Sequence, residues 1–344
     1  MYEYPKPQKS VPLWEVIIKA TVTAQVMLTA ILGNTLIVMV VLWNKSLRTT
    51  TNFFIVNLAI SDILVTVSCT WVHLVKDLTE GWILGVFFCK FNSFVQVVST
   101  VTSILSMVLI ACDRFFGIVF AMKAHIIERR ARNSLIFVWI ISIAVGMPML
   151  FFRKLYSRQW KNHNEQWCDD DWPSEHFHTY RRAYWTFITV VLFFLPIVVM
   201  GGAYFGIIKT LWTAQAPGER LAKDVNIQIK VKRKVVMMLV TILAVFGICW
   251  FPVQFSILYS EYKTEKSEKL EEWYEDFTFF AYFFALSNSA INPIIYTAFN
   301  ENFRKEVIQH SHKHIHVYFY QQFYMIPIAF LYTLRNDNLG PPKV

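Results

Sequence analysis

The residues of this sequence that could do chemistry are ionisable and amide side chains set inside otherwise apolar segments. Asp62 lies in the middle of an apolar run over residues 50–75. An ionisable group inside a bilayer costs about 2.5–3.5 kcal/mol on insertion scales, so such a residue needs a partner or a function. Other apolar segments hold oxygen-bearing residues that could surround it: Ser103, Asn288, Ser289 and Asn292. This set could hold a small hard cation or a proton, or it could join helices as a hydrogen-bonded cluster.

The pair Asp113-Arg114 lies near the end of another apolar run, residues 88–118. Neighbouring residues cannot stack along one helix face, but the carboxylate can still brace the guanidinium near a membrane surface. In one interpretation the arginine simply extends toward the lipid headgroups. In the other, the pair is a latch that releases the arginine when the helices move.

Phe246 and Trp250 are four residues apart on one helix face, directly before Pro252. A proline inside a helix removes a hydrogen bond and favours a kink. Three other apolar segments are interrupted in the same way, by Pro148, Pro196 and Pro293. Aromatic bulk beside a hinge could couple a ligand above it to helix motion below it, or it could be simple core packing.

The elements that must position these side chains are membrane-spanning helices. The 344 residues are 55% hydrophobic and 17% aromatic, which is too apolar for an ordinary soluble protein. Seven apolar segments are long enough to cross a bilayer with some tilt. They cover residues 14–42, 50–75, 88–118, 134–152, 184–209, 235–260 and 277–299. We therefore predict an all-α membrane protein, a bundle of seven helices with the third at its centre.

Charge in the loops predicts the orientation. Lysine and arginine are concentrated after the first, third and fifth segments, whereas the 153–183 and 261–276 loops are acidic. An excess of Lys and Arg marks the cytoplasmic side, so we expect a multi-pass plasma-membrane protein with its N-terminus outside and its C-terminus inside. The predicted divisions are an extracellular N-terminus (1–13), a transmembrane domain (14–299), a short amphipathic helix on the membrane surface (300–309) and a cytoplasmic tail (310–344).

Only two of the five cysteines, Cys89 and Cys168, fall on the outer side of this topology. A disulfide between them is the natural pairing in an oxidising environment, and two free thiols are the alternative. The cysteines form no CxxC pair, and the spans contain no nucleophile–base or metal-binding constellation, so we expect neither an enzyme nor a resident cofactor. The net charge of +9 does not indicate nucleic-acid binding, because the basic residues lie between apolar runs.

The order of the motifs resembles the rhodopsin-like (class A) family of G-protein-coupled receptors over residues 14–308. The matching residues recur one set per helix. They are Gly33-Asn34, Asn57-Leu58-Ala59 with Asp62, Cys89, Asp113-Arg114-Phe115, Trp139, Cys168, Pro196 with Tyr204, Phe246 with Cys249-Trp250-Phe251-Pro252, and Asn292-Pro293-Ile294-Ile295-Tyr296. Each match alone is weak, but their common order is specific.

The resemblance implies a role for each set. Cys89 and Cys168 correspond to the outer disulfide of the family. The oxygen-rich set corresponds to its sodium site, with Na⁺ as an allosteric ion: Asp62, Ser103, Asn288, Ser289 and Asn292. The activation switch corresponds to Phe246, Trp250, Pro252, Asn292, Pro293, Tyr296 and Tyr204. Coupling to a heterotrimeric G protein corresponds to Asp113, Arg114, Phe115 and Met122. Arrestin and membrane lipid are the other expected partners.

Two departures from the family pattern concern the inner end of the bundle. The usual Asp-Arg-Tyr is Asp113-Arg114-Phe115 here, which loses a hydroxyl but keeps the charge pair. The base of the sixth helix reads Lys232-Arg233-Lys234 and offers no acid to Arg114. We therefore expect the inactive state to depend on Asp113 alone.

The resemblance also narrows the ligand. Gln96 stands where amine receptors carry an aspartate, so an amine would lack its counter-ion. Leu286 stands where opsins carry the retinal-binding lysine. Gln96, the stretch Trp82–Gly85 and the stretch over 48–62 are similar to receptors for neuropeptide FF, orexin and tachykinins. We expect a short, amidated, cationic peptide.

Six residues are predicted to bind that peptide. Gln96 would lie near its terminus, with Trp71, Ile257 and Tyr282 lining the site. Asp169 and Asp170 would belong to an acidic entrance that attracts a cation, or simply to a solvated acidic loop. The competing functions are an ion-coupled transporter or channel, because Asp62 could mark an ion path, and a rhodopsin-like receptor for a non-peptide ligand.

Overall fold

The computed structural model describes residues 11–120, 128–161, 164–173, 177–213, 219–263 and 272–299, together with Arg304. Within these residues seven helices are long and apolar enough to cross a membrane, so the predicted seven-helix fold is confirmed. Met122 and the predicted amphipathic helix over 300–309, apart from Arg304, lie outside the described residues. So does the predicted tail over 310–344.

Two of the seven spans are built from more than one helical element. The first, third, fourth, sixth and seventh are α1 (Leu13–Trp43), α4 (Gly85–Ile118), α5 (Glu128–Phe152), α8 (Glu219–Lys263) and α9 (Glu272–Phe299). The second joins α2 (Thr50–Val65), the π-helix η2 (Thr66–Thr70) and α3 (Trp71–Leu78). The fifth joins α6 (Phe177–Thr186), the π-helix η4 (Phe187–Phe194) and α7 (Leu195–Thr213). A short 3₁₀ turn, η1 (Lys45–Leu47), follows α1.

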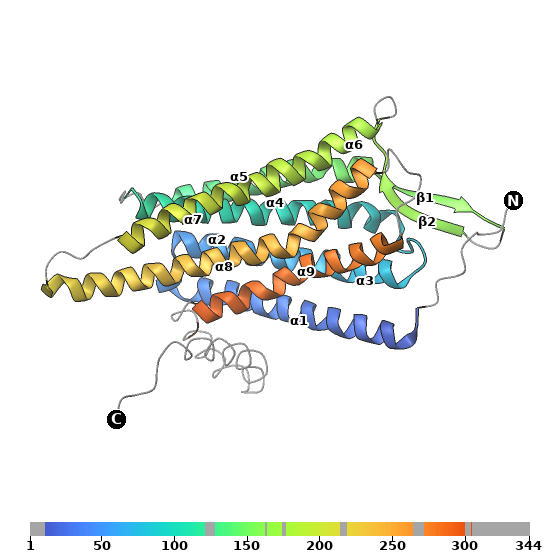
Figure 1. Ribbon diagram of the computed structural model, residues 1–344. Coiled ribbons are helices and arrows are strands. Elements are labelled where there is room, and N and C mark those ends of the chain that lie inside the picture. The colour runs from blue at the N-terminus through green and yellow to red at the C-terminus, as the bar shows by residue number, and fades with distance from the viewer. Residues whose placement is uncertain are drawn as a thin grey trace.

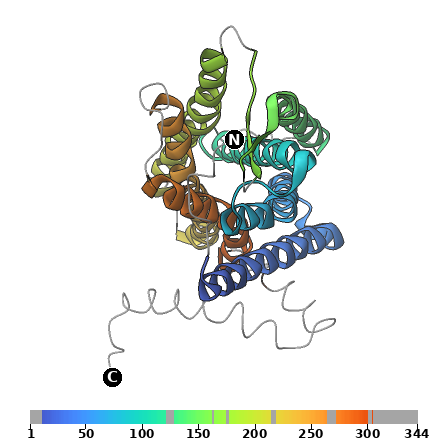
Figure 2. The same cartoon turned by 90° about the vertical axis from the view of Figure 1, so that its right-hand side faces the viewer.

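The helix α4 is the centre of the bundle. Of the residues in its most apolar window, 72% are buried, compared with 33% in α1 and 22% in α5. Five of its six hydroxyl residues are buried: Ser99, Thr100, Thr102, Ser103 and Ser106. Small side chains let neighbouring helices approach closely in a membrane. The predicted central position of the third span is therefore confirmed, while α1 lies at the edge of the bundle (Figure 2).

The outer faces of the helices are apolar. Val198 and Phe205 on α7 and Ile248 on α8 expose 70%, 70% and 72% of their surfaces. A soluble protein would bury such side chains, whereas in a bilayer they contact lipid tails of similar polarity. The bundle is thus apolar outside and partly polar inside.

The 153–183 loop contains an antiparallel hairpin that the sequence did not predict. Strand β1 (Arg153–Gln159) pairs with β2 (Asn164–Asp170), with Leu155 opposite Cys168. Tyr156 and Trp167 face each other across the strands as stacked rings with centroids 5.6 Å apart, which is the kind of cross-strand pair that stabilises a sheet. The hairpin covers one end of the bundle (Figure 1). We call this the hairpin end, and the opposite end, where α4 carries Arg114, the Arg114 end.

The prolines and π-helices interrupt regular helix geometry, as the sequence predicted for the prolines. Pro148, Pro252 and Pro293 lie inside α5, α8 and α9. Pro196 is the second residue of α7, two residues after the end of η4. The two π-helices were not predicted. A π-helix adds a residue to the local turn and changes the direction in which later side chains point.

α1 approaches α9 closely at Gly33. A Cβ atom at this position would lie 2.7 Å from Cβ of Pro293 and 2.8 Å from its Cγ. The ring of a proline is rigid and cannot move aside as a long side chain would. The approach of α1 to α9 therefore depends on the absence of a side chain at residue 33.

We predict that Gly33→Ala separates α1 from α9 and destabilises the protein by about 1–3 kcal/mol, the usual cost of overpacking a tight contact. The measurement is the thermal unfolding midpoint of the purified protein. Gly201→Ala is the matched control, since a Cβ there meets nothing within 4 Å. Equal midpoints for the two variants would contradict the prediction.

Candidate functional site

Asp62 is buried and bound by α9. Its side chain accepts a hydrogen bond from Ser289 Oγ (2.9 Å) on one oxygen and from Asn292 Nδ2 (2.8 Å) on the other. Asn34 of α1 donates from Nδ2 to the Ser289 carbonyl oxygen (2.9 Å). The group joins α1, α2 and α9 in the middle of the bundle. The structure thus brings together three of the five residues predicted for the ion site.

The other two predicted ion-site residues, Ser103 and Asn288, lie on α4 and α9. Ser103 Oγ is 3.1 Å from Ser61 Oγ, which also donates to the Ser99 carbonyl (2.9 Å). Asn288 is buried, and its Oδ1 atom, like that of Asn292, has no hydrogen-bond partner among the described residues. Buried oxygens without donors suit a hard cation, since an unpaired buried acceptor is costly. The residues therefore fit a small cation such as Na⁺.

Asn57 links three helices beside this group. It donates from Nδ2 to Ser106 Oγ on α4 (2.8 Å) and accepts from Trp139 Nε1 on α5 (2.9 Å). Ser106 in turn donates to the Thr102 carbonyl (2.7 Å). One side chain of α2 thus satisfies partners on two neighbouring helices.

The Asp–Arg pair is formed at the Arg114 end. Arg114 Nε donates to Asp113 Oδ2 (3.0 Å), and Thr51 Oγ1 of α2 donates to the same oxygen (3.1 Å). Only 2% of the Asp113 side chain is exposed, compared with 27% of Arg114. Among the described residues, Asp113 is the acid that forms an ion pair with Arg114. Asp113 is therefore held by α2 while it holds the arginine, as a latch requires.

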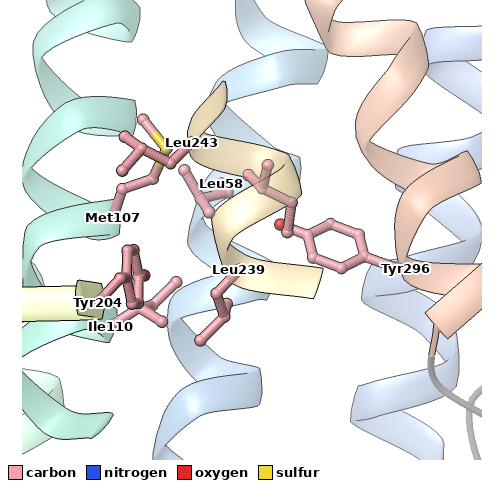
Figure 3. A pocket seen from close by; sticks show the side chains of 8 residues that line it. Leu58, Met107, Ile110, Tyr204, Leu239, Leu243 and Tyr296 are labelled. Atoms are coloured by element: carbon pink, nitrogen blue, oxygen red, sulfur yellow. The ribbon is translucent and has the colours of Figure 1, made fainter. Parts of the chain in front are cut away.

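Tyr204 and Tyr296 line a cavity between α2, α4, α7, α8 and α9, which we call the tyrosine cavity (Figure 3). Both side chains are buried, and Tyr296 Oη has no hydrogen-bond partner among the described residues. The remaining lining is apolar: Leu58, Met107, Ile110, Leu239, Ile242 and Leu243. The two predicted switch tyrosines thus face one apolar space.

The aromatic residues before Pro252 form a stack in the core. The ring centroids of Phe246 and Trp250 are 5.9 Å apart, and Phe193 of η4 lies 5.9 Å from Phe246. One turn beyond, Thr189 Oγ1 donates to Gln254 Oε1 (2.9 Å), with both residues buried. The stack therefore packs the sixth span, beside its proline, against the π-helix of the fifth.

Gln96 and Tyr282 meet at His73, a residue that sequence reasoning missed. His73 Nε2 is 3.1 Å from Gln96 Oε1, and the His73 ring stacks on Tyr282 with centroids 4.4 Å apart. A second ionisable residue in the apolar second span was the available signal. These residues come from α3, α4 and α9, and we call them the His73 group.

The two other predicted pocket residues lie apart from the His73 group. Trp71 Nε1 donates to the Val67 carbonyl (3.0 Å), and its ring meets Phe88 edge-on at 5.0 Å. Ile257 of α8 is half-buried against the main core of the bundle. Among the described residues, neither side chain hydrogen-bonds to Gln96, so any common role would depend on a ligand large enough to reach all of them.

Asp170 lies in a buried ion cluster at the hairpin end. It accepts from Arg153 Nη1 (2.6 Å) and from Trp185 Nε1 (2.9 Å), and its side chain is 1% exposed. Arg181 of α6 donates to Glu261 of α8 (2.8 Å) and lies 3.4 Å from Asp169. We call Arg153, Arg181, Asp169, Asp170 and Glu261 the arginine–carboxylate cluster. Its acids are already paired within the protein.

A disulfide joins the hairpin to the centre of the bundle. Cys89 of α4 and Cys168 of β2 are bonded with their Cα atoms 5.7 Å apart, as predicted. Cys69 and Cys249 are buried free thiols, and Cys112 is an exposed one. Trp82 packs with the disulfide, and its backbone N donates to the Gln166 carbonyl (2.7 Å). The hairpin is thus held both covalently and by main-chain hydrogen bonding.

A seven-helix bundle with a disulfide-held hairpin at one end and an Asp–Arg pair at the other is the architecture of a seven-transmembrane receptor. The chain matches the family "7 transmembrane receptor (rhodopsin family)" over residues 33–296. It therefore belongs to the rhodopsin-like G-protein-coupled receptors, as the resemblance implied.

Similar proteins within this family are named peptide receptors. A QRFP-like peptide receptor of Branchiostoma floridae is 35% identical over 293 residues, covering 81% of this chain and 73% of the relative. The pyroglutamylated RF-amide peptide receptor of Rattus norvegicus is 35% identical over 294 residues (81% and 66%). The substance-P receptor of Mus musculus is 29% identical over 293 residues (85% and 70%).

We predict that Asp170→Asn weakens the arginine–carboxylate cluster and lowers the free energy of unfolding by about 3 kcal/mol, the low end for breaking a buried ion pair. The reason is that Arg153 loses its charged partner inside the protein. The measurement is the thermal unfolding midpoint of the purified receptor, which should fall by several degrees.

The neighbouring Asp171→Asn is the matched control. Asp171 is 32% exposed and pairs with Lys154, which is 57% exposed. This contact holds the pKa of Asp171 below its usual value. Its small stabilising effect is therefore present at neutral pH and is lost as pH falls through the lowered pKa. We expect no measurable shift of the midpoint for Asp171→Asn, and a shift as large as that of Asp170→Asn would contradict the assignment.

Proposed function

We propose that this receptor binds an extracellular peptide and passes the signal to a heterotrimeric G protein. The observation that carries the proposal is the His73 group, which lies below the disulfide-held hairpin in a chain whose relatives are named peptide receptors. In this proposal the hairpin end faces the outside of the cell and the Arg114 end faces the cytoplasm. The protein is then a plasma-membrane receptor that also binds arrestin.

The chemistry of the His73 group suits the amidated end of a peptide. A carboxamide offers both an N–H donor and a carbonyl acceptor. The Gln96 amide can accept a hydrogen bond from the first and donate one to the second. His73 orients Gln96 Oε1 through their 3.1 Å contact, and Tyr282 supports the His73 ring. A peptide terminus would bind by exchanging this internal hydrogen bond for two of its own. Trp71 and Ile257 would contact residues further along the peptide.

A cationic side chain of the peptide would meet the arginine–carboxylate cluster. The cluster holds three carboxylates, Asp169, Asp170 and Glu261, and two guanidiniums. These five side chains together carry one net negative charge. Asp169 is the most accessible acid, with 41% of its side chain exposed, whereas Asp170 is fully engaged. We therefore assign the contact with a ligand cation to Asp169 and the positioning of the hairpin to Asp170.

Transmission follows the buried contacts from the hairpin end to the Arg114 end. Gln96 shares α4 with Arg114, and Trp250 shares α8 with residues that line the tyrosine cavity. In the proposed mechanism the third, sixth and seventh spans rearrange, Arg114 leaves Asp113, and Tyr204 and Tyr296 move within their shared apolar space. Na⁺ bound at Asp62 would favour the resting arrangement. Phe115 and Met122 would contact the G protein.

We predict that cells that produce this chain respond to short amidated peptides in a calcium or cAMP assay. Gln96→Leu should raise the half-maximal concentration about 10- to 100-fold, because one or two hydrogen bonds of a buried polar end are lost. The free-acid form of the same peptide should be the weaker agonist. The control is Gln159→Leu, an exposed glutamine of β1.

The opposite outcome also has a defined meaning. If no peptide produces a signal while Asp62→Asn changes an ion current, the chain is a transporter or channel and the receptor proposal is wrong. If the amidated and free-acid peptides are equally potent, peptide binding stands but the role of Gln96 at the amide does not.

We also predict that replacing Na⁺ by a large organic cation raises agonist affinity severalfold in the wild-type protein and has no effect in Asp62→Asn. The reason is that a cation held by Asp62 favours the state that binds agonist weakly. The measurement is competition binding in the two salts at equal ionic strength. Asp77→Asn, which alters an aspartate of the same span that pairs with Lys19, is the control and should keep the sodium effect.

A further inference from the structure

Arg233 of α8 makes three contacts with the end of α7. Its Nη2 and Nε atoms both donate to the Leu211 carbonyl oxygen, at 2.6 and 3.2 Å. Its guanidinium also lies over the Trp212 ring, 4.5 Å from the ring centroid. Arg233 is near the start of the membrane-crossing part of α8, which begins at Ile229. These contacts therefore join the Arg114 ends of the fifth and sixth spans.

The chemistry of this contact is that of a helix cap. α7 ends at Thr213, so the Leu211 carbonyl is one of the last four of the helix, which have no partner inside it. An arginine at a helix C-terminus both donates to such a carbonyl and complements the negative end of the helix dipole. Stacking on Trp212 adds a cation–π interaction. A lysine could supply the charge but neither the forked donation nor the flat stacking surface.

The end of α7 is itself fixed to the centre of the bundle. Ile207 and Leu211 are 0% and 4% exposed. Gly206 lies so close to Phe115 of α4 that a Cβ atom there would be 3.1 Å from the ring. α8 is thus tied to α7 by Arg233, and α7 is packed on α4. This indirect connection exists where the stretch Lys232-Arg233-Lys234 offers no acid to Arg114.

We propose that Arg233 is a positioning residue that holds the Arg114 end of α8 closed and so restrains signalling in the absence of ligand. The cap takes the place of a direct ion pair between α4 and α8. Opening of α8 then requires either that the Arg233 contacts break or that α7 leaves Phe115 together with α8. The resting state depends on this cap as well as on Asp113.

The first test is ligand-independent G-protein activation, normalised to the amount of receptor at the cell surface. Arg233→Ala is expected to raise it about 3- to 10-fold, because a charge-assisted hydrogen bond is lost from the closed state. Arg233→Lys should lie between the wild type and Arg233→Ala. Lys232→Ala is the matched control for loss of one basic charge at the same helix end and should leave basal activity unchanged.

The second test does not depend on coupling. Spin labels on the Arg114 ends of α4 and α8 in the purified receptor, without any G protein, report the distance between them. Arg233→Ala is expected to increase the population with the longer distance, and Lys232→Ala is not. An unchanged distance distribution overturns the proposal, as does a fall in basal activity in Arg233→Ala, which would mean that Arg233 contacts the G protein instead. If no G protein couples at all, the proposed function fails while the distance measurement still decides the role of Arg233.

Discussion

The fold depends on one buried carboxylate. Asp62 accepts hydrogen bonds from Ser289 and Asn292, and the Ser289 carbonyl accepts one from Asn34. As a result, α1, α2 and α9 meet around a single carboxylate. A bilayer offers no water to such a group, and each polar contact between helices is worth only about 1 kcal/mol there. The network is therefore costly to build, and it leaves three asparagine oxygens, Oδ1 of Asn34, Asn288 and Asn292, without a hydrogen-bond partner among the described residues.

Around that group, α4 carries the features that connect the two ends of the molecule. Cys89 is bonded to the hairpin, and Gln96 belongs to the His73 group. Ser106 accepts a hydrogen bond from Asn57, and Arg114 is paired with Asp113. The contacts fall on one helix at successive depths. The hairpin end and the Arg114 end are thus joined by a single continuous element, with α2, α5 and α7 packed against it.

The features of this structure that could be predicted from the sequence are those that a local residue pattern determines. Apolar length gives the seven spans, and the topology leaves Cys89 only Cys168 as a partner. The contacts of Asp62 with Ser289 and Asn292 follow from the need to satisfy a charge in a membrane. The hairpin, the pairing of Asp170 with Arg153 and the cap formed by Arg233 could not be predicted. Each depends on which elements meet after folding, and none has a period or spacing that marks it in the chain.

The π-helix Phe187–Phe194 sets how the second half of the fifth span is rotated relative to the first half. Deleting one residue within it would turn every later side chain of α7 by about 100° relative to α6. Tyr204 would then leave the tyrosine cavity and the Leu211 carbonyl would turn away from Arg233, while Arg181 and Trp185 would keep their places under the hairpin. A single insertion or deletion at this bulge can therefore reorient the Arg114 half of the fifth span without reorienting the half that lies under the hairpin.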